Sequence, residues 1–356
     1  MLNIAIIGSN GQVGCEVAFC LSLMDNITTT CFVRSAYSSF LFRQANIKSV
    51  AADFGKVQDL HADLSGFDLV ADFSYPSGEL PDFQKRISNH VTAVMSRMKR
   101  GSKYVHMSSL MAFGMPAGMR EIQYFRVPRS SYAVVKRSSE KAVFRSASTN
   151  KVEPFCIRLG EVHGVFQSVS QQIRQQLSRG QILVEGEPHE ASIAVFASSV
   201  AHALVQIGNG TVVSGTHSLT ANPQWTLMEV YDFYQSKLQS PSDVRFIGCH
   251  RPTIRQSIRQ TLLHVLMPYR FWLDAGVLMH HPKLFAKAKG TYRKLIATSR
   301  IPDLLPSAVR QAVLVGTVAD KMSGILSDRI TVEKTLASIK AQLDHYLTCA
   351  KFKENR

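Results

Sequence analysis

The sequence predicts an α/β protein with a doubly wound parallel sheet, a small interleaved lobe and a helical appendage at its C-terminal end. Three observations support this fold class. The chain has 356 residues, 45% hydrophobic and 19% charged, which allows a large buried core and about two domains. In its first half, short apolar runs alternate with amphipathic stretches, the pattern of βαβ units. A turn with three glycines stands between the first apolar run and the first amphipathic stretch.

Each element of the predicted fold follows from one of these runs or stretches. Six apolar runs predict the strands Ile4–Ile7, Thr28–Val33, Ser49–Ala52, Leu69–Phe73, Tyr104–Met107 and Pro154–Ile157. Amphipathic periodicity predicts helices near 12–24, 83–99, 132–147, 168–179 and 194–208. After Pro241 the pattern is almost wholly helical and is interrupted by five prolines. We therefore expect a core over 1–165, an interleaved lobe over 166–240 and a helical extension over 241–356.

The six cysteines indicate a reduced, cytoplasmic protein. No two of them have C-x-x-C spacing, and six cysteines in so long a chain do not form a disulfide framework, which excludes zinc ribbons and small secreted folds. The first residues lead directly into an apolar run, without the basic region or cleavage site of a targeting signal. The most apolar long stretch, 261–279, is broken by charged residues and a proline, so we expect no membrane-spanning helix.

The net charge of +15 is concentrated in one segment. Residues 251–300 carry ten lysines and arginines against one acidic residue, Asp274, interleaved with leucine and aromatic residues. The segment fits several alternatives: helices packed on the core with solvated cations, a peripheral contact with an anionic inner membrane surface, a lid over a nucleotide diphosphate, or a docking face for another enzyme. No reader motif accompanies the charge, so we expect no nucleic acid binding. His280 and His281 lack a second ligand pair, and we predict no metal site.

The three glycines predict a turn that binds phosphate groups. Gly8 permits a tight turn after the first strand, Gly11 lets the backbone approach a pyrophosphate, and Gly14 lets the following helix pack on the sheet. Free N–H groups and the helix dipole then attract the anion. The spacing is one residue longer at the front than the common fingerprint, but the strand–turn–helix context is the one that the motif requires. The predicted cofactor contacts in this turn are Gly8, Asn10, Gly11, Gln12, Val13 and Gly14.

Arg34 favours NADP(H) over NAD(H) as the cofactor. It follows the second strand, where an acidic residue would bind an adenosine ribose and repel a 2′-phosphate, and no acidic residue stands nearby. NAD(H) is the alternative, with Arg34 as a solvated surface cation. Asp53, after the third strand, is a candidate partner of the adenine amino group or a helix cap. The predicted cofactor contacts also include Phe73, Ser74, Leu159 and Gly160.

Tyr132 and Lys136 form the second candidate motif. They stand one helical turn apart, so their side chains leave the same face of the predicted helix. A phenol ionises near pH 10 in water, and a lysine ammonium beside it favours the phenolate that acid–base chemistry at neutral pH requires. The same ammonium can bind a cofactor ribose. Ser109 ends the fifth strand and is a candidate donor to a substrate oxygen, with a capping role as the alternative for Ser108 or Ser109.

Together these residues resemble the extended short-chain dehydrogenase/reductase superfamily, in its branch of NAD(P)-dependent nucleotide-sugar epimerases and dehydratases. The resemblance covers about residues 1–235, and its markers are Gly8, Gly11, Gly14, Asp53, Asn89, Ser108, Ser109, Tyr132, Lys136 and the stretch 158–164. It implies an NAD(P)-binding Rossmann core over 1–165 and a substrate lobe over 166–240. It also implies that Tyr132 is the catalytic acid/base and that Lys136 lowers its pKa and holds the cofactor ribose. Ser109 would orient the substrate, and Asn89 would support a water relay.

Two departures from the family pattern refine the expected activity. Members that dehydrate a sugar at C4–C6 carry an Asp-Glu pair where this chain has Leu110 and Met111, which argues against a 4,6-dehydratase. Glu161 and His163 replace the usual asparagine and tyrosine, which leaves substrate recognition open. We therefore expect hydride transfer on a nucleotide-linked or lipid-diphosphate-linked sugar, by an epimerase or a net reductase. The alternative is a non-catalytic NADP-binding scaffold or redox sensor. The resemblance also implies a homodimer that pairs the helices carrying Asn89 and Tyr132.

Overall fold

The computed structural model describes most of the first 247 residues of the chain. The described residues are 1–35, 39, 42–43, 45–54, 62–74, 83–113, 131–164, 166–190, 192–219, 225–239 and 241–247. The expected basic segment 251–300 and the rest of the expected helical extension from residue 248 onward lie outside the described residues. Cys249 and Cys349 lie there too, while Cys15, Cys20, Cys31 and Cys156 are buried free thiols, as predicted.

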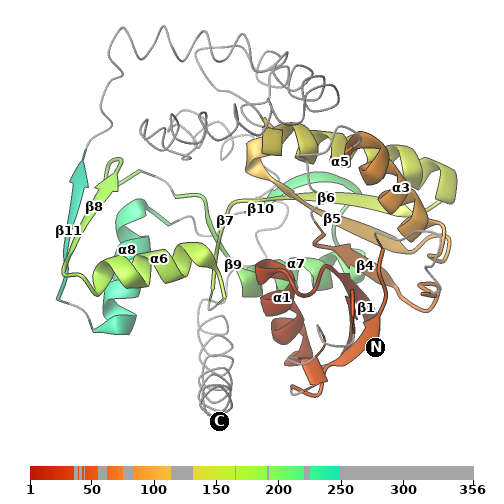
Figure 1. The fold of residues 1–356 in the computed structure, drawn as a ribbon, viewed down its shortest axis with the longest axis horizontal. Helices are drawn as coiled ribbons and strands as arrows, with labels where there is room; N and C mark the ends of the chain where they lie inside the picture. Colours follow the sequence, from red (N-terminus) through yellow and green to blue (C-terminus); the bar gives the residue numbers. More distant parts are fainter. Residues whose placement is uncertain are drawn as a thin grey trace, which may run out of the picture.

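A seven-stranded parallel sheet forms the centre of the fold (Figure 1). Its strands are β1 (Leu2–Ile7), β2 (Ile27–Val33), β3 (Lys48–Ala51), β4 (Leu69–Asp72), β5 (Lys103–Ser109), β6 (Glu153–Leu159) and β10 (Gly215–Leu219). Their order across the sheet is β10-β6-β5-β4-β1-β2-β3, so the direction of winding reverses between β1 and β4. In doubly wound folds, ligands bind at the carboxyl ends of the strands at this reversal. The six predicted strands are confirmed to within two residues at either end.

Two pairs of helices cover the two faces of the sheet (Figure 1). Helices α1 (Gln12–Ser22) and α7 (Ala197–Gly208) pack on one face, and α3 (Phe83–Met95) and α5 (Ser131–Asn150) pack on the other. In β1, Ile4 and Ile6 join the core beneath α1 and α7, whereas Ile7 joins the core beneath α3 and α5. Because both faces are covered, the strand is apolar without interruption, and this continuity is why the sequence predicted it correctly.

A smaller lobe lies beside the sheet (Figure 1). It comprises α6 (Ser168–Leu177), β8 (Gln181–Glu185), α8 (Leu227–Leu238) and β11 (Asp243–Ile247), around a core with an aromatic cluster of Phe196, Trp225, Phe233 and Tyr234. The short strands β7 (Glu161–His163) and β9 (Ala194–Phe196) pair with each other in parallel. The chain leaves the main sheet after β6 and returns to it with α7 and β10 before it forms α8, so the lobe is interleaved with the core.

Two secondary-structure predictions need correction. The segment after Pro241 was expected to be helical, but Asp243–Ile247 forms β11, which pairs in parallel with β8 across the expected boundary at residue 240. Val244 and Phe246 pack on the lobe core while their neighbours are exposed, an alternation that identifies a strand with one buried face. The helix expected over 194–208 begins at Ala197, because 194–196 is strand β9. Within the described residues, no helix is long and apolar enough to cross a membrane.

Candidate active site

The glycine turn packs directly against the end of β4. Gly8 has a φ of 74°, in the left-handed region, and its carbonyl oxygen accepts a hydrogen bond of 3.0 Å from the Gly11 N–H. A Cβ added to Gly8 would lie 2.7 Å from the backbone nitrogen of Ser74, and one added to Gly14 would lie 2.7 Å from the Gly8 carbonyl oxygen. Neither position therefore accepts a side chain, and the turn is held against Phe73 and Ser74, two of the predicted cofactor contacts.

The N-terminus of α1 has the features of an anion site. Gly11 occupies the N-cap and has no side chain to bind the first N–H groups, and the first turn carries no acidic residue. Asn10, Gly11 and Gln12 are exposed, and Val13 is half-buried. The N–H groups of the first helical turn, together with the helix dipole, suit a pyrophosphate. The residues present therefore fit the dinucleotide expected from the sequence.

A buried carboxylate joins α1 to the segment that follows β7. Glu16 is fully buried, and its Oε2 accepts hydrogen bonds from Gln167 Nε2 at 2.8 Å and from the Phe166 N–H at 3.2 Å. The Gln167 Nε2 also donates to the Gln12 carbonyl oxygen at 3.0 Å. A Cβ added to Gly164 would overlap the Glu16 carboxylate. The start of the lobe is thereby fixed beside the glycine turn.

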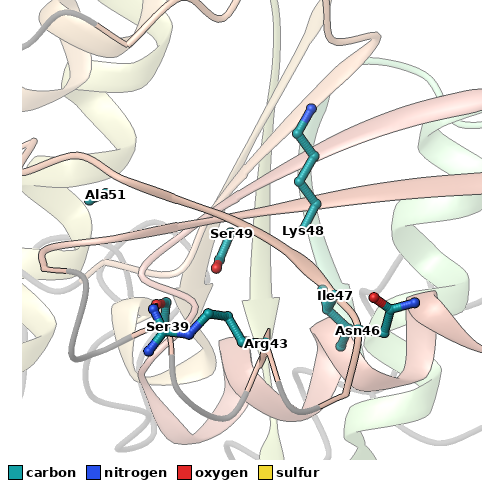
Figure 2. A pocket seen from close by; sticks show the side chains of 7 residues that line it. All are labelled: Ser39, Arg43, Asn46, Ile47, Lys48, Ser49 and Ala51. Carbon is teal, nitrogen blue, oxygen red and sulfur yellow. The ribbon is translucent and has the colours of Figure 1, made fainter.

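The residues expected at the adenosine end lie after β2 and β3. Arg34 is exposed directly after β2, and Asp53 is half-buried after β3. A polar hollow of about 460 Å³ lies along β3, the edge strand, and Figure 2 shows Arg43 reaching Ser39 in its wall while Lys48 points away. The Arg43 Nη1 donates to the Ser39 Oγ at 2.7 Å. None of the seven residues that line the hollow is a predicted cofactor contact, so the hollow is separate from the predicted set.

The other two predicted cofactor contacts lie at the end of β6. Leu159 is the last residue of that strand and is buried in the core beneath α1 and α7. Gly160 donates its N–H to the carbonyl oxygen of Leu219, the last residue of β10, at 3.2 Å. His163, which stands where the family has a tyrosine, is buried in the lobe with its Nδ1 3.0 Å from the Tyr234 hydroxyl. It therefore packs within the lobe.

The structure brings Ser109, Tyr132 and Lys136 together. Ser109 is the last residue of β5 and is half-buried, and its side chain is hydrogen-bonded to that of Tyr132. Lys136 lies one turn further along α5, with its Nζ 5.8 Å from the centroid of the Tyr132 ring. The three side chains thus meet at the carboxyl edge of the sheet, where the resemblance places the reacting groups.

The charge state of this group differs from the expectation in one respect. Partial burial raises the pKa of Tyr132, and the hydrogen bond with Ser109 acts in the opposite direction. Lys136 is only 6% exposed, and burial lowers its pKa to about 8 despite the nearby carboxylates of Asp72 and Glu140. The expected lowering of the Tyr132 pKa by Lys136 is therefore absent from this structure. The Lys136 Nζ instead donates to the Met107 carbonyl oxygen at 2.6 Å.

The contact of α3 with the end of β4 is made by His90 and not by Asn89. Asn89 is exposed, whereas its neighbour His90 faces inward, with Nε2 2.7 Å from Asp72 Oδ2 and 3.0 Å from Ser74 Oγ. Consecutive helical residues project about 100° apart, so Asn89 and His90 lie on different faces of α3. The structure thus identifies His90 as the residue on α3 that touches a predicted cofactor contact.

Ser108 has a structural partner. Its hydroxyl donates to Glu140 Oε1 at 2.5 Å, and Arg158 holds the same carboxylate with two hydrogen bonds of 2.8 and 2.7 Å. All three side chains are largely buried, and the paired charges make the burial tolerable. Of the two adjacent serines, Ser109 is therefore the one that reaches Tyr132. Arg158, a marker of the family resemblance, ties β6 to α5.

A second group of polar residues, which the sequence did not reveal, lies between the sheet and the helices α3 and α5. It comprises Asp72, His90, Tyr104 and His106. The local sequence signal was limited to Asp72, near the end of the apolar run 69–73, and His106, inside the apolar run 104–107. Their contact depends on the pairing of β4 with β5, where Asp72 and His106 are direct neighbours.

The fold and the site together define a dinucleotide-binding α/β protein with a serine–tyrosine–lysine group. The chain belongs to the NAD dependent epimerase/dehydratase family, which matches residues 4–207. No curated protein matches the chain.

Solved structures of nucleotide-sugar enzymes share the fold. The UDP-N-acetylglucosamine 4-epimerase from Bacillus cereus is 17% identical, over 70% of this chain and 86% of its own, with a TM-score of 0.55. The UDP-glucuronic acid 4-epimerase from Bacillus cereus, in complex with UDP-glucuronic acid and NAD, is 14% identical over 69% and 86%, with a TM-score of 0.51. The dTDP-glucose 4,6-dehydratase from Bacillus anthracis, in complex with NAD, is 14% identical over 70% and 86%, with a TM-score of 0.50. At these identities the likeness shows the fold alone.

Proposed function

We propose that this protein is an NAD(P)-dependent epimerase or reductase that acts on a nucleotide-linked or lipid-diphosphate-linked sugar, with Tyr132 as the acid/base. The observation that supports it most is the grouping of three side chains: Tyr132 is hydrogen-bonded to Ser109, and the Lys136 ammonium lies 5.8 Å from the Tyr132 ring. Membership of the epimerase/dehydratase family agrees with this proposal.

The proposed roles follow from the positions of the three side chains. When bound, a nicotinamide supplies hydride acceptance and donation. The Tyr132 hydroxyl exchanges a proton with a sugar hydroxyl, and Ser109 orients the same oxygen by hydrogen bonding. Lys136, in its charged form, binds the cofactor ribose. Leu110 and Met111, directly after Ser109, offer no carboxylate to protonate a leaving hydroxyl, and for this reason we place the protein among epimerases or reductases rather than 4,6-dehydratases.

We propose NADP(H) as the preferred cofactor, with NAD(H) as the alternative. The support is the exposed Arg34 at the end of β2, which offers a charged hydrogen-bond donor to a 2′-phosphate. Asp53 is the proposed partner of the adenine amino group. Two of the structurally similar enzymes named above were solved with NAD.

The direct test is to purify the full chain, release any bound nucleotide and identify it by mass spectrometry. A panel of nucleotide sugars is then offered with NADP(H) or NAD(H), and products are analysed for epimerisation or net reduction. The proposal expects at least one sugar to be converted, with Tyr231→Phe, a half-buried tyrosine of the lobe, unaffected as the control. Cofactor binding without conversion of any nucleotide-linked or lipid-linked sugar would contradict it.

A second candidate is a non-catalytic dinucleotide-binding scaffold or redox sensor. The observation in its favour is that burial raises the pKa of Tyr132, whereas a general base at neutral pH needs a lower one. This candidate predicts tight cofactor binding and no turnover, and it predicts that Tyr132→Phe leaves every measurable property of the protein unchanged.

A further inference from the structure

We propose that Asp72 and His90 are positioning residues of the candidate active site, forming a buried ion pair that fixes Phe73 and Ser74 against the glycine turn and sets the charge of Lys136. The catalytic consequence of this pair rests on the function proposed above. The effect of the pair on the charge of Lys136 does not depend on that function and can be measured in the protein without substrate.

The pair belongs to a polar row across the face of the sheet beneath α3 and α5. Asp72, His106 and Cys156 are direct neighbours on β4, β5 and β6. The same face also carries apolar residues such as Ile7, which join a core with Val91 of α3 and Val143 of α5. Neighbouring strands lie about 4.8 Å apart, so these three side chains are in close mutual reach.

Asp72 is held as a carboxylate. It is fully buried, and its Oδ1 accepts the Ser74 N–H at 2.8 Å. Its Oδ2 accepts the Tyr104 hydroxyl at 2.6 Å and lies 2.7 Å from His90 Nε2. Burial alone would raise the pKa of Asp72, but His90 and the hydrogen bonds hold it below its ordinary value.

His90 is placed to carry the balancing positive charge. Its Nε2 faces Asp72 and the Ser74 hydroxyl, and its Nδ1 lies 3.4 Å from the Phe54 carbonyl oxygen. Both ring nitrogens therefore face oxygen acceptors, an arrangement that suits the doubly protonated ring. Although burial opposes it, Asp72 raises the pKa of His90 above its ordinary value. The pair holds Ser74 through its backbone and its side chain.

Lys136 lies at the other end of this row. Its Nζ binds the carbonyl oxygen of Met107, one residue along β5 from His106, which is the strand neighbour of Asp72. His106 is 3% exposed, and neither ring nitrogen has a hydrogen-bond partner among the described residues. Burial and the Lys136 charge lower the pKa of His106 to about 3, so this ring is neutral at physiological pH and adds no charge between the carboxylate and the ammonium.

Charged and titratable groups from four elements lie near Lys136. They are Asp72 from β4, His106 from β5, Cys156 from β6, and Tyr132 and Glu140 from α5. The negative charge of Glu140 is already balanced by Arg158, which donates two hydrogen bonds to its carboxylate. Asp72 is therefore the carboxylate whose charge most directly offsets the burial of Lys136, and His90 moderates that charge from the far side.

Two substitutions should move the titration midpoint of Lys136 in opposite directions. Asp72→Asn removes the negative charge that stabilises the protonated form of Lys136. The titration midpoint of Lys136 should therefore fall by about one pH unit. His90→Gln removes the balancing positive charge while it leaves an N–H donor for Asp72, so the midpoint rises. Asp68→Asn is the matched control, because Asp68 is exposed at the opposite end of the same strand, where it accepts the Asn3 N–H.

The experiment is a titration of the full chain labelled with ¹³Cε-lysine and followed by NMR, with the Lys136 signal assigned by its loss in Lys136→Arg. A fall in Asp72→Asn, a rise in His90→Gln and no change in Asp68→Asn are the expected results. An unmoved midpoint in Asp72→Asn overturns the proposal. If Asp72→Asn does not fold, His90→Gln decides alone, and the absence of a rise overturns it. Shifted midpoints without conversion of any sugar would remove the proposed function and leave this inference standing.

Discussion

The ammonium nitrogen of Lys136 lies 2.6 Å from the carbonyl oxygen of Met107, and this hydrogen bond anchors α5 to the carboxyl end of β5. The anchor places Lys136 beneath Tyr132, close to the serine that ends the same strand. A 6%-exposed ammonium is costly, because burial disfavours its charged form. With a pKa of about 8, the charge of Lys136 responds to neighbouring charges near neutral pH.

The stability of the protein should reveal the buried charge of Lys136. Its pKa is about 8 in the folded state and 10.5 in the reference state, so between these values the unfolded chain binds more protons and stability rises with pH. Relative to Lys136→Met, the wild-type protein should gain about 1–2 kcal/mol of unfolding free energy between pH 7.5 and 9.5. Urea unfolding of both proteins at the two pH values measures this, and a gain of zero or a loss would contradict it.

Adding a methyl group to the glycine turn should abolish its fit against β4. In Gly8→Ala, the new Cβ meets the Ser74 backbone at 2.7 Å and the residue keeps a φ of 74°. We expect at least a tenfold loss of dinucleotide affinity and destabilisation of about 1–3 kcal/mol. Gly66→Ala is the control, because its added Cβ meets nothing within 4 Å. Calorimetric titration and thermal melting provide the measurements, and near-wild-type affinity in Gly8→Ala would remove the turn from the site.

The cofactor preference should depend on Arg34. Arg34→Glu replaces a donor to a 2′-phosphate with a repelling carboxylate, so binding of NADPH should weaken by about 10- to 100-fold relative to NADH. Arg179→Glu, also exposed but in the lobe, is the matched charge control. Dissociation constants of both cofactors are measured by fluorescence. Equal weakening for the two cofactors would show that Arg34 does not read the 2′-phosphate.

The fold was predictable wherever burial leaves a local trace. The strands of the main sheet are apolar on both faces, and the glycine turn carries its own spacing, so both could be read directly. Strand β10, with the sequence Gly-Thr-His-Ser-Leu, has a single large apolar residue and gave no such signal. Strand β11 alternates over only five residues and was mistaken for part of a helical segment.

The candidate site, like the fold, was predictable only where a local sequence pattern marks its residues. Tyr132 and Lys136 are one helical turn apart, so their association needs no knowledge of the fold. Asp72, His90 and His106 are brought together by the pairing of β4 with β5 and by the packing of α3, which no local pattern encodes. The role of Asn89 in a water relay stays a prediction, and its neighbour His90 is the residue that contacts Asp72 and Ser74.

A homodimer through α3 and α5 remains a prediction, and Phe144 offers a test of it. This phenylalanine of α5 is 37% exposed, so it is available to a second copy if α5 forms the interface. If α5 pairs with a second copy, Phe144→Glu should convert a dimer into a monomer in analytical ultracentrifugation. Leu183→Glu, at an exposed position of the lobe, should leave the dimer intact. A monomeric wild-type protein would rule the arrangement out.

The most direct test of the proposed chemistry is the turnover of Tyr132→Phe on the sugar found by the screen, with the cofactor dissociation constant measured in parallel. The substitution removes the hydroxyl that is hydrogen-bonded to Ser109 and leaves the ring in place. We expect a loss of turnover of about 10²- to 10⁴-fold, with cofactor affinity within about threefold of wild type. Full turnover in Tyr132→Phe would contradict this expectation.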